Sequence, residues 1–218
     1  MRLSLFANRY LRDREEEVLN ALTHSFGLGL AASMTVALYF KAVPLGPWHT
    51  VCALVYGLAH VLVYLSSVAY HLTSWPPLKT RLRLVDQSAI FLAITGTYTP
   101  VLALGLSGVL GYALTVLLWA ACLYGIVYKV RHRAQPEQGS LISYLLFAAA
   151  GGLLFFFCRT GPIHESRTVF LVSGAFDLVG LVFYMWHYKR WFHTVWHVMV
   201  LLGHITHFYA VWTYFIRP

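Results

Sequence analysis

Charged side chains are scarce in this chain of 218 residues. Asp, Glu, Lys and Arg make up 11 % of it, and only eight residues are acidic. A soluble globular domain carries about 25 % charged residues. Hydrophobic residues reach 59 % and the mean hydropathy is +0.64. Because so few charges cannot cover a water-facing surface, the composition excludes a soluble domain and predicts an integral membrane protein.

Other scarcities exclude further classes. Three cysteines are too few for a disulfide scaffold, and the sixteen glycines follow no collagen-like period. Strands of a membrane β-barrel would alternate polar and apolar residues over about 10 positions, and that pattern is missing. The first seventeen residues are charged and the first apolar run is too long for a signal core, so we expect no cleavable signal peptide.

Seven apolar runs are long enough to span a bilayer, for which a helix needs about 20 residues. We therefore predict an all-α membrane protein, a seven-transmembrane helix bundle forming one domain over residues 1–218. The predicted spans are Val18–Phe40, Thr50–Leu72, Leu84–Leu104, Val109–Tyr128, Leu141–Cys158, Val169–Trp186 and Phe192–Phe215. Proline and glycine separate them, at Pro44–Pro47, Trp75–Pro77, Gly105–Gly111, Gln135–Gly139 and Gly161–Pro162. We expect Pro100 to kink or end the third span.

Basic residues are distributed unequally between the two sides of this topology. Twelve of the sixteen lie in the N-terminal segment and the second, fourth and sixth connections. The positive-inside rule places that side in the cytoplasm, so the N-terminus is expected inside and the C-terminus outside. We therefore expect a multi-pass protein of the cell (inner) membrane. Topology and anionic lipid account for the net charge of +8, and no nucleic-acid partner is expected.

Polar residues from distant segments share one depth in this topology. They would lie in the cytoplasmic leaflet, although almost 180 positions separate the first from the last. They are Glu17, Asn20, His24, Ser67, His71, Asp86, His193 and His197. Ser67 and His71 are four residues apart, as are His193 and His197, so each pair shares one helix face. Ionisable groups inside a membrane are costly and usually mark a functional site.

Three of these histidines suit a metal ion. His193 and His197 can bind one ion from a single helix, and His71 supplies the third ligand of a catalytic zinc site, whose fourth position is left to water. Three imidazoles without a thiolate favour Zn²⁺. Asp86 would orient the site or act as general base.

Several of these residues also have a simpler explanation. Asp86 can pair with Arg83 at the interface. Asn20 and His24 are candidate ligands too, but we favour packing between helices or support of the three ligands. Glu17 can favour a helix N-terminus, whose dipole attracts a carboxylate. Four further polar residues lie deeper and would line a cavity or simply pack together, namely His60, Asp177, His204 and His207.

The combination of motifs resembles the hemolysin III family, the bacterial branch of the progestin and adipoQ receptor family. The residues that carry the resemblance are Glu16 or Glu17, Asn20-x-x-x-His24, Ser67-x-x-x-His71, Asp86 and Phe192-His193-x-x-Trp196-His197. The resemblance covers nearly the whole chain. It implies a seven-helix bundle with zinc bound by His71, His193 and His197 near the cytoplasmic face, with Asp86 and Ser67 beside it. The wider superfamily includes alkaline ceramidases, which suggests hydrolysis of a lipid amide.

Three functions remain open at this stage. The first is a zinc-dependent intramembrane hydrolase whose substrate is a membrane lipid amide or ester. The second is a non-enzymatic membrane sensor or homeostasis protein in which zinc is structural. The third is an ion-conducting or transport protein that uses the deeper polar residues, and a cytolysin-like activity is implied only by the family name. Neither the oligomeric state nor the identity of the lipid follows from the sequence.

Overall fold

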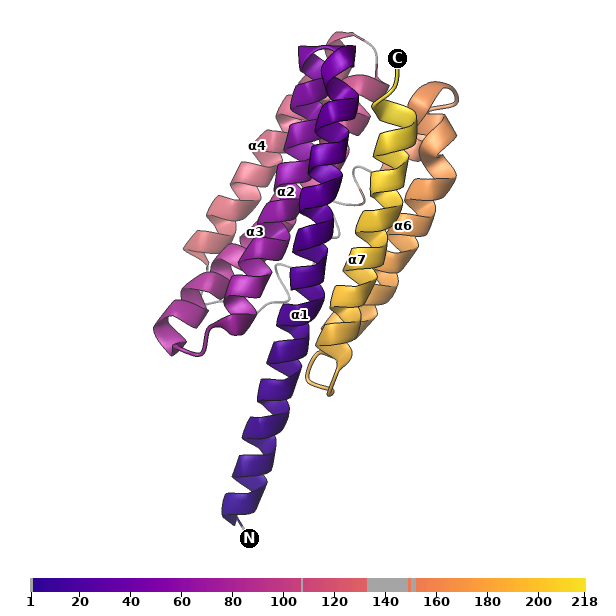
Figure 1. The fold of residues 1–218 in the computed structure, drawn as a ribbon. Helices are drawn as coiled ribbons and strands as arrows, with labels where there is room; N and C mark the ends of the chain where they lie inside the picture. Colours follow the sequence, from indigo (N-terminus) through magenta and orange to yellow (C-terminus); the bar gives the residue numbers. More distant parts are fainter. Residues whose placement is uncertain (1, 107, 133–148, 150–151) are drawn as a thin grey trace.

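A computed structural model describes residues 2–106, 108–132, 149 and 152–218, with the backbone alone for residues 2–13. Every regular element among these residues is a helix (Figure 1). The long helices are α1 (Arg2–Ala42), α2 (Pro47–Leu72), α3 (Pro76–Gly105), α4 (Val109–Arg131), α6 (Gly161–Met185) and α7 (Phe192–Ala210). A short 3-10 turn, η1 (Val43–Leu45), follows α1, and a π-helical turn, η2 (Val211–Phe215), extends α7.

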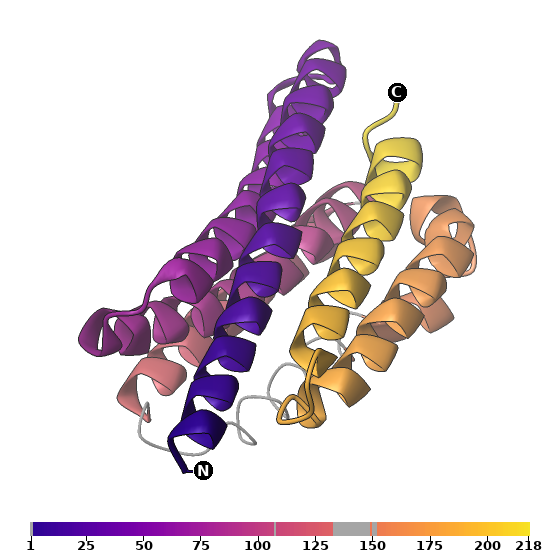
Figure 2. The same ribbon diagram turned by 60° about the horizontal axis from the view of Figure 1, so that its bottom comes forward.

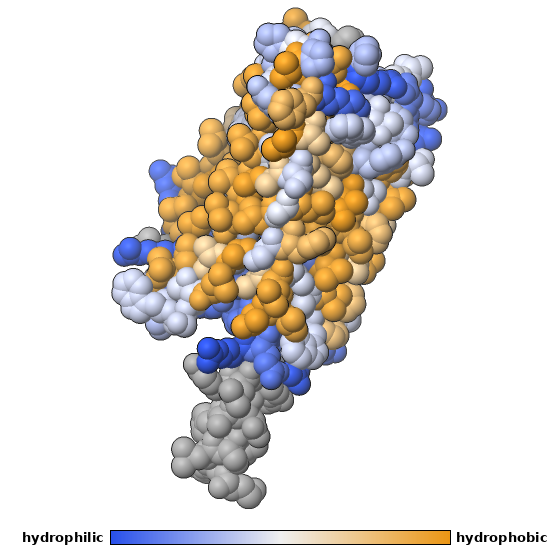
Figure 3. All heavy atoms as spheres, viewed as in Figure 1, coloured by the Kyte–Doolittle hydropathy of each residue, from blue (hydrophilic) through white to orange (hydrophobic). Residues whose placement is uncertain are grey.

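The described residues contain six helices that are long and apolar enough to cross a membrane. Figure 3 shows a broad hydrophobic middle with hydrophilic residues gathered towards both ends. Large apolar side chains face outward along this middle zone, such as Val116, Leu117 and Phe157, which are 67 %, 64 % and 77 % exposed. Contact with lipid tails explains such exposure, so the chain is an all-helical membrane protein.

The fifth predicted span, Leu141–Cys158, lies mostly outside the described residues, as does the expected break at Gln135–Gly139. Within this span only residue 149 and residues 152–158 are described, and all of them except Cys158 are helical. The count of seven spans and the sidedness of the termini therefore stay predictions.

Several helices begin earlier than predicted. α1 starts at Arg2 instead of Val18, α3 at Pro76 instead of Leu84, and α6 at Gly161 instead of Val169. The last two carry proline in their first turn, where the missing N–H has no helical partner to lose. Among the described residues, Pro76 and Pro162 thus both separate two spans and lie in the first turn of a helix.

Two interpretations are corrected by these boundaries. Pro100 does not end its helix, because α3 continues through it to Gly105. Glu17 does not lie at a helix N-terminus, because α1 begins fifteen residues earlier at Arg2. The helix-dipole explanation of Glu17 is therefore wrong, and its carboxylate must be explained by the groups it contacts.

The helices pack in two neighbouring groups (Figures 1 and 2). α1, α2, α3 and α4 contact one another in sequence order, while α6 packs on α7 and α7 returns to α1. The two termini lie at opposite ends of the bundle in both views. α7 therefore closes the arrangement beside α1 and brings its N-terminal residues next to the end of α2.

Candidate metal centre

Three imidazoles meet where α2 ends and α7 begins. One ligand nitrogen from each of His71, His193 and His197 lies within 4.8 Å of the other two, and these are the residues of the one metal-binding group found in the described part of the chain. His71 and His197 are buried and His193 is half-buried. His71 comes from the last turn of α2, and the other two come from the first two turns of α7. The structure thus brings together the three residues predicted as ligands.

A carboxylate orients the His71 ring. Glu17 Oε2 lies 2.8 Å from His71 Nδ1 and 3.0 Å from Lys79 Nζ. Because an ionised carboxylate only accepts hydrogen bonds, His71 Nδ1 carries the proton and Nε2 carries the lone pair. Nε2 is buried without a hydrogen-bond partner. A ligating histidine commonly donates its other N–H to a carboxylate in this way.

The backbone of α1 orients the His197 ring. The carbonyl oxygen of Asn20 lies 3.3 Å from His197 Nδ1, and Thr23 Oγ1 lies 3.2 Å from the same nitrogen. Thr23 donates its own hydroxyl proton to the Asn20 carbonyl, so towards His197 it accepts. Both partners require a proton on Nδ1, which leaves the lone pair on Nε2. The Asn20 side chain also accepts a hydrogen bond from Thr194 and ties α1 to α7.

The donor set fits a bound metal ion. His197 Nε2 lies 3.1 Å from His193 Nε2. Two nitrogens that each lie about 2.0–2.1 Å from a tetrahedral zinc ion are about 3.3–3.4 Å apart, close to this spacing. The unpartnered His71 Nε2 provides a third donor in the same group. The three histidines can therefore hold a metal ion, and imidazoles alone suit zinc, copper, iron or nickel.

Asp86 is outside this group of ligands. Its carboxylate hydrogen-bonds the side chain of Ser67, one turn before His71 on α2. None of its oxygens belongs to the set of ligand atoms within 4.8 Å of one another. The two residues predicted as catalytic, Ser67 of α2 and Asp86 of α3, thus contact each other. The candidate metal ligands are the three histidines alone.

His24 packs against the centre. Its ring stacks on that of His197 with centroids 3.6 Å apart and meets Tyr64 edge-on at 5.2 Å. Both of its nitrogens are buried without a hydrogen-bond partner. His24 is absent from the group of converging ligand atoms, so the geometry places it behind a ligand.

Three consecutive glutamates fix α1 to the neighbouring turns. Glu15 Oε2 lies 2.8 Å from Arg190 Nη2, and Glu16 Oε1 accepts the backbone N–H of Trp191 at 3.2 Å. Trp191 has a left-handed backbone, with φ of 69°, directly before α7 begins. The glutamate contacts stabilise this turn and so position His193 and His197 one to two turns later.

The sequence analysis did not identify two of the residues that orient the ligands or tie their helices together. Thr23 and Thr194 are ordinary polar residues in apolar helices, and neither belongs to a motif. Only the depth they share with Asn20 could have drawn attention to them. Four of the deeper polar residues, His60, Asp177, His204 and His207, are not part of the metal centre, and three of them form a separate cluster described below.

Replacing Glu17 should weaken metal binding without removing it. Loss of the carboxylate frees the His71 ring, and removal of such a partner typically lowers metal affinity about 10–100-fold. Zinc affinity of Glu17→Ala, measured by chelator competition in detergent, is expected to fall in this range. Glu165→Ala is the matched control, because that acid pairs with Arg217 and has no contact with the metal centre. Equal affinities for the two variants would contradict a role of Glu17 in orienting His71.

Comparison with known proteins identifies the family of this chain. Residues 12–208 match the model of a family described as "Haemolysin-III related". The chain is 32 % identical over 209 residues to the Hemolysin-3 homolog of Bacillus subtilis, which covers 93 % of this chain and 96 % of that one. It is also 32 % identical to Hemolysin-3 of Bacillus cereus, with 92 % of each chain covered. Identity to the human Monocyte to macrophage differentiation factor is 26 %, over 96 % of this chain and 88 % of that one. The match spans every helix that contributes to the metal centre, and the chain belongs to the haemolysin-III related family.

Proposed function

We propose that this protein is a zinc-dependent hydrolase of a membrane lipid amide or ester, with its active site near the cytoplasmic face of the inner membrane. The observation that carries the proposal is the convergence of three imidazole nitrogens, each within 4.8 Å of the others. The Asp86 carboxylate is hydrogen-bonded to Ser67, one turn before the ligand His71 on α2. A purely structural zinc site commonly has four protein ligands, whereas a catalytic one has three and keeps one position open.

The residues divide the work of hydrolysis between them. A zinc ion held by His71, His193 and His197 would polarise a carbonyl and lower the pKa of a water molecule to about 7. Asp86 accepts the proton of the attacking water at a carboxylate oxygen and returns it to the leaving group. Ser67 holds the Asp86 carboxylate in place, and Glu17 keeps the Nδ1 proton on His71.

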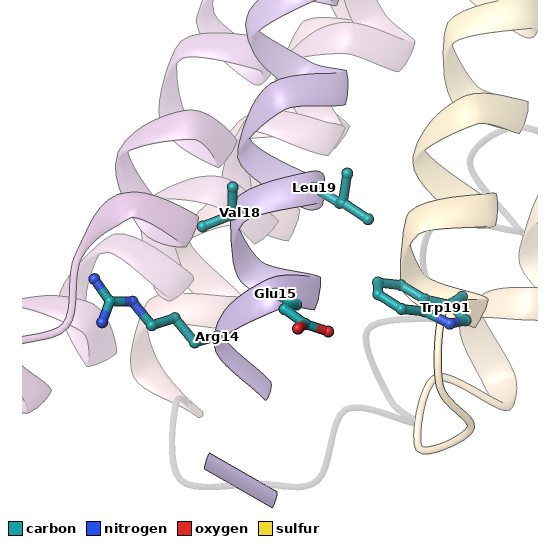
Figure 4. Close-up of a pocket in the computed structure, with 5 residues that line it drawn as sticks. All are labelled: Arg14, Glu15, Val18, Leu19 and Trp191. Carbon is teal, nitrogen blue, oxygen red and sulfur yellow. The ribbon is translucent and has the colours of Figure 1, made fainter. Parts of the chain in front are cut away.

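A groove beside the centre supports a lipid substrate. Arg14, Glu15, Val18 and Leu19 of α1 line it together with Trp191, which comes before α7. In Figure 4 Glu15 and Leu19 are directed towards the Trp191 ring, whereas Arg14 extends to the opposite side of α1. The wall of this groove combines apolar side chains with one guanidinium at the end of the membrane zone. Val18 is 47 % exposed, so an acyl chain can lie along α1 while a polar headgroup stays near Arg14. Trp191, which lines this groove, lies two residues before the ligand His193.

The orientation of the protein is part of this proposal. The centre lies at the end of the bundle that carries most of the basic connections, including Lys79 and Arg190 beside it. The positive-inside rule assigns this end to the cytoplasm. The N-terminus then lies in the cytoplasm and the C-terminus outside.

Hydrolysis can be tested with purified full-length protein in detergent micelles. Release of fatty acid from a long-chain N-acyl amide and from the matching ester is expected with zinc bound. Asp86→Asn should lower the rate about 10²–10⁴-fold, because a general base contributes that much, while zinc content is unchanged. Glu165→Gln is the matched control, since that acid pairs with Arg217 at the other end of the chain. Undiminished turnover in Asp86→Asn would overturn the assignment.

A sensor or homeostasis protein with structural zinc is the second candidate. It is favoured by the way the centre joins three helices, since Glu17 of α1, His71 of α2 and His197 of α7 are linked by direct contacts. In that case removing zinc should unfold the bundle, whereas a catalytic zinc leaves most of the fold intact. Thermal unfolding before and after dialysis against a chelator separates the two.

A further inference from the structure

A second group of buried polar rings lies deeper in the bundle and is not explained by the metal centre. This mid-membrane cluster consists of Tyr56, His60 and Tyr64 of α2 with His204 and His207 of α7. All five are at most 9 % exposed. Eight residues separate Tyr56 from Tyr64, so the cluster extends about 12 Å along the axis of α2. That distance is a large part of a hydrocarbon core about 30 Å thick.

Two tyrosine–histidine hydrogen bonds connect the helices. Tyr64 Oη lies 3.1 Å from His204 Nδ1, and Tyr56 Oη lies 2.8 Å from His207 Nδ1. The His60 ring lies between the two pairs. It stacks on His204 with centroids 4.2 Å apart and 11° between the planes, and its centroid is 4.9 Å from that of His207.

The cluster does not have the geometry of a second metal site. Nitrogen lone pairs lie in the ring plane, so the nearly parallel planes of His60 and His204 aim their lone pairs side by side and not at one point. His60 Nδ1 is also engaged, because it donates to the Tyr56 carbonyl at 2.8 Å. Among the described residues, the only group of converging ligand atoms is the one at the metal centre.

Packing alone does not explain the cluster either. His204 Nε2 is buried without a hydrogen-bond partner, which destabilises a fold inside hydrocarbon. An aromatic hydrocarbon side chain at this position would avoid that penalty. Buried imidazoles and acids inside membranes typically form proton relays. An acid lies nearby, because the Asp177 carboxylate reaches α7 at Gly203 and lies close enough to Tyr64 to interact electrostatically.

We propose that the mid-membrane cluster is the central segment of a proton pathway through the bundle. The imidazoles of His204 and His207 each accept a proton at one nitrogen as they release another from the opposite nitrogen. His60, whose Nδ1 donates to the Tyr56 carbonyl, packs between them. Each tyrosine hydroxyl likewise accepts one proton and donates its own. Only O–H and N–H bonds form and break, and one proton leaves for each that enters, so no oxidant or further reactant is required. A water molecule at His204 Nε2 would join the Tyr64–His204 and Tyr56–His207 pairs, whose imidazole centroids are 5.3 Å apart.

Both ends of the segment approach polar surroundings. At one end the Tyr64 ring contacts His24, which lies beside the metal centre and the charged groups around Glu17. At the other end His207 lies one turn before η2, where Lys41 donates to the carbonyl of Trp212. The cluster thus lies between charged groups near its two ends, Glu17 with Lys79 beside the metal centre and Lys41 beside η2.

The test uses full-length protein in liposomes that enclose a pH-sensitive dye. A potassium gradient with valinomycin sets the voltage, and the initial rate of proton uptake is measured. Tyr64→Phe and Tyr56→Phe each remove one oxygen and keep the ring, so each should lower the rate about tenfold or more. Tyr112→Phe, in an exposed ring on α4, is the control and should conduct like the wild type. Replacing water with deuterium oxide should also lower the rate of proton uptake by the wild type.

Two outcomes would overturn the proposal. One is a wild-type rate no higher than that of empty liposomes, and the other is an unchanged rate in both tyrosine variants. His193→Ala separates this inference from the proposed function, because it should abolish hydrolysis while proton uptake persists. If the wild-type protein hydrolyses neither substrate but takes up protons in a tyrosine-dependent way, the proton pathway stands and the hydrolase is rejected.

Discussion

His193→Ala is expected to purify with less than about a tenth of the zinc bound by the wild-type chain. Removing one of three imidazoles leaves two nitrogens, which are too few for the three-ligand site that zinc occupies in enzymes. His71→Ala should behave alike, although its nitrogen comes from a different helix. Loss of hydrolysis would follow in both, because the carbonyl is no longer polarised.

His187→Ala is the matched control for metal content. This histidine lies six residues before His193, is exposed, and uses Nδ1 on the carbonyl oxygen of Tyr184. Zinc is measured by elemental analysis of the purified proteins after identical chelator washes, and gel filtration verifies that the variants are folded. Full zinc content in His193→Ala would show that the three imidazoles do not hold the ion.

The helices that carry the site were predictable because their apolar runs are long. In Phe192–Phe215 the predicted span coincides with α7 and η2 together, and in Thr50–Leu72 it ends where α2 ends. Helix starts were less predictable, since hydropathy reports the lipid-facing part only. The first turns of α3 contain Lys79, Arg81 and Arg83, which are helical although they are charged.

The convergence of the three histidines was predictable from depth and spacing. His71 at the end of one span and His193 at the start of another share a leaflet, and i,i+4 spacing adds His197. The groups that orient each histidine ring were harder to predict. The Asn20 prediction relied on its side chain, whereas the group that contacts His197 is the backbone carbonyl, which any residue would provide.

The deeper polar residues show a different limit. Their positions along the predicted spans placed His60, His204 and His207 deeper in the membrane but could not distinguish a cavity from packed rings. The pairing of His204 with Tyr64 and of His207 with Tyr56 depends on how α7 returns beside α2, and that is a property of the whole bundle. Tyrosine is common in membrane helices, so these partners carried no signal of their own.

Gly57→Ala is expected to destabilise the bundle severely, because α1 and α2 touch at this residue. A Cβ at position 57 would lie within 3 Å of three side-chain atoms of Thr35, the nearest being its hydroxyl oxygen. Thr35 cannot easily turn away, since it is buried and its hydroxyl donates to the Ala31 carbonyl at 2.6 Å. Overpacking a tight helix contact costs about 1–3 kcal/mol and occasionally more. Close approach of helices through small residues is also what holds membrane bundles together.

Gly29→Ala distinguishes this clash from a general effect of the substitution. Position 29 lies in α1 with open space around its Cβ, and alanine is about 1 kcal/mol better than glycine inside a helix. Thermal unfolding in one detergent should therefore rank Gly29→Ala at or above the wild type and Gly57→Ala well below it. Since α1 carries Glu17 and Asn20 while α2 carries His71, separating the two helices at Gly57 should also weaken zinc binding, with no change to any ligand. Equal melting temperatures for the two variants would mean that α1 and α2 do not approach as closely as Thr35 and Gly57 require.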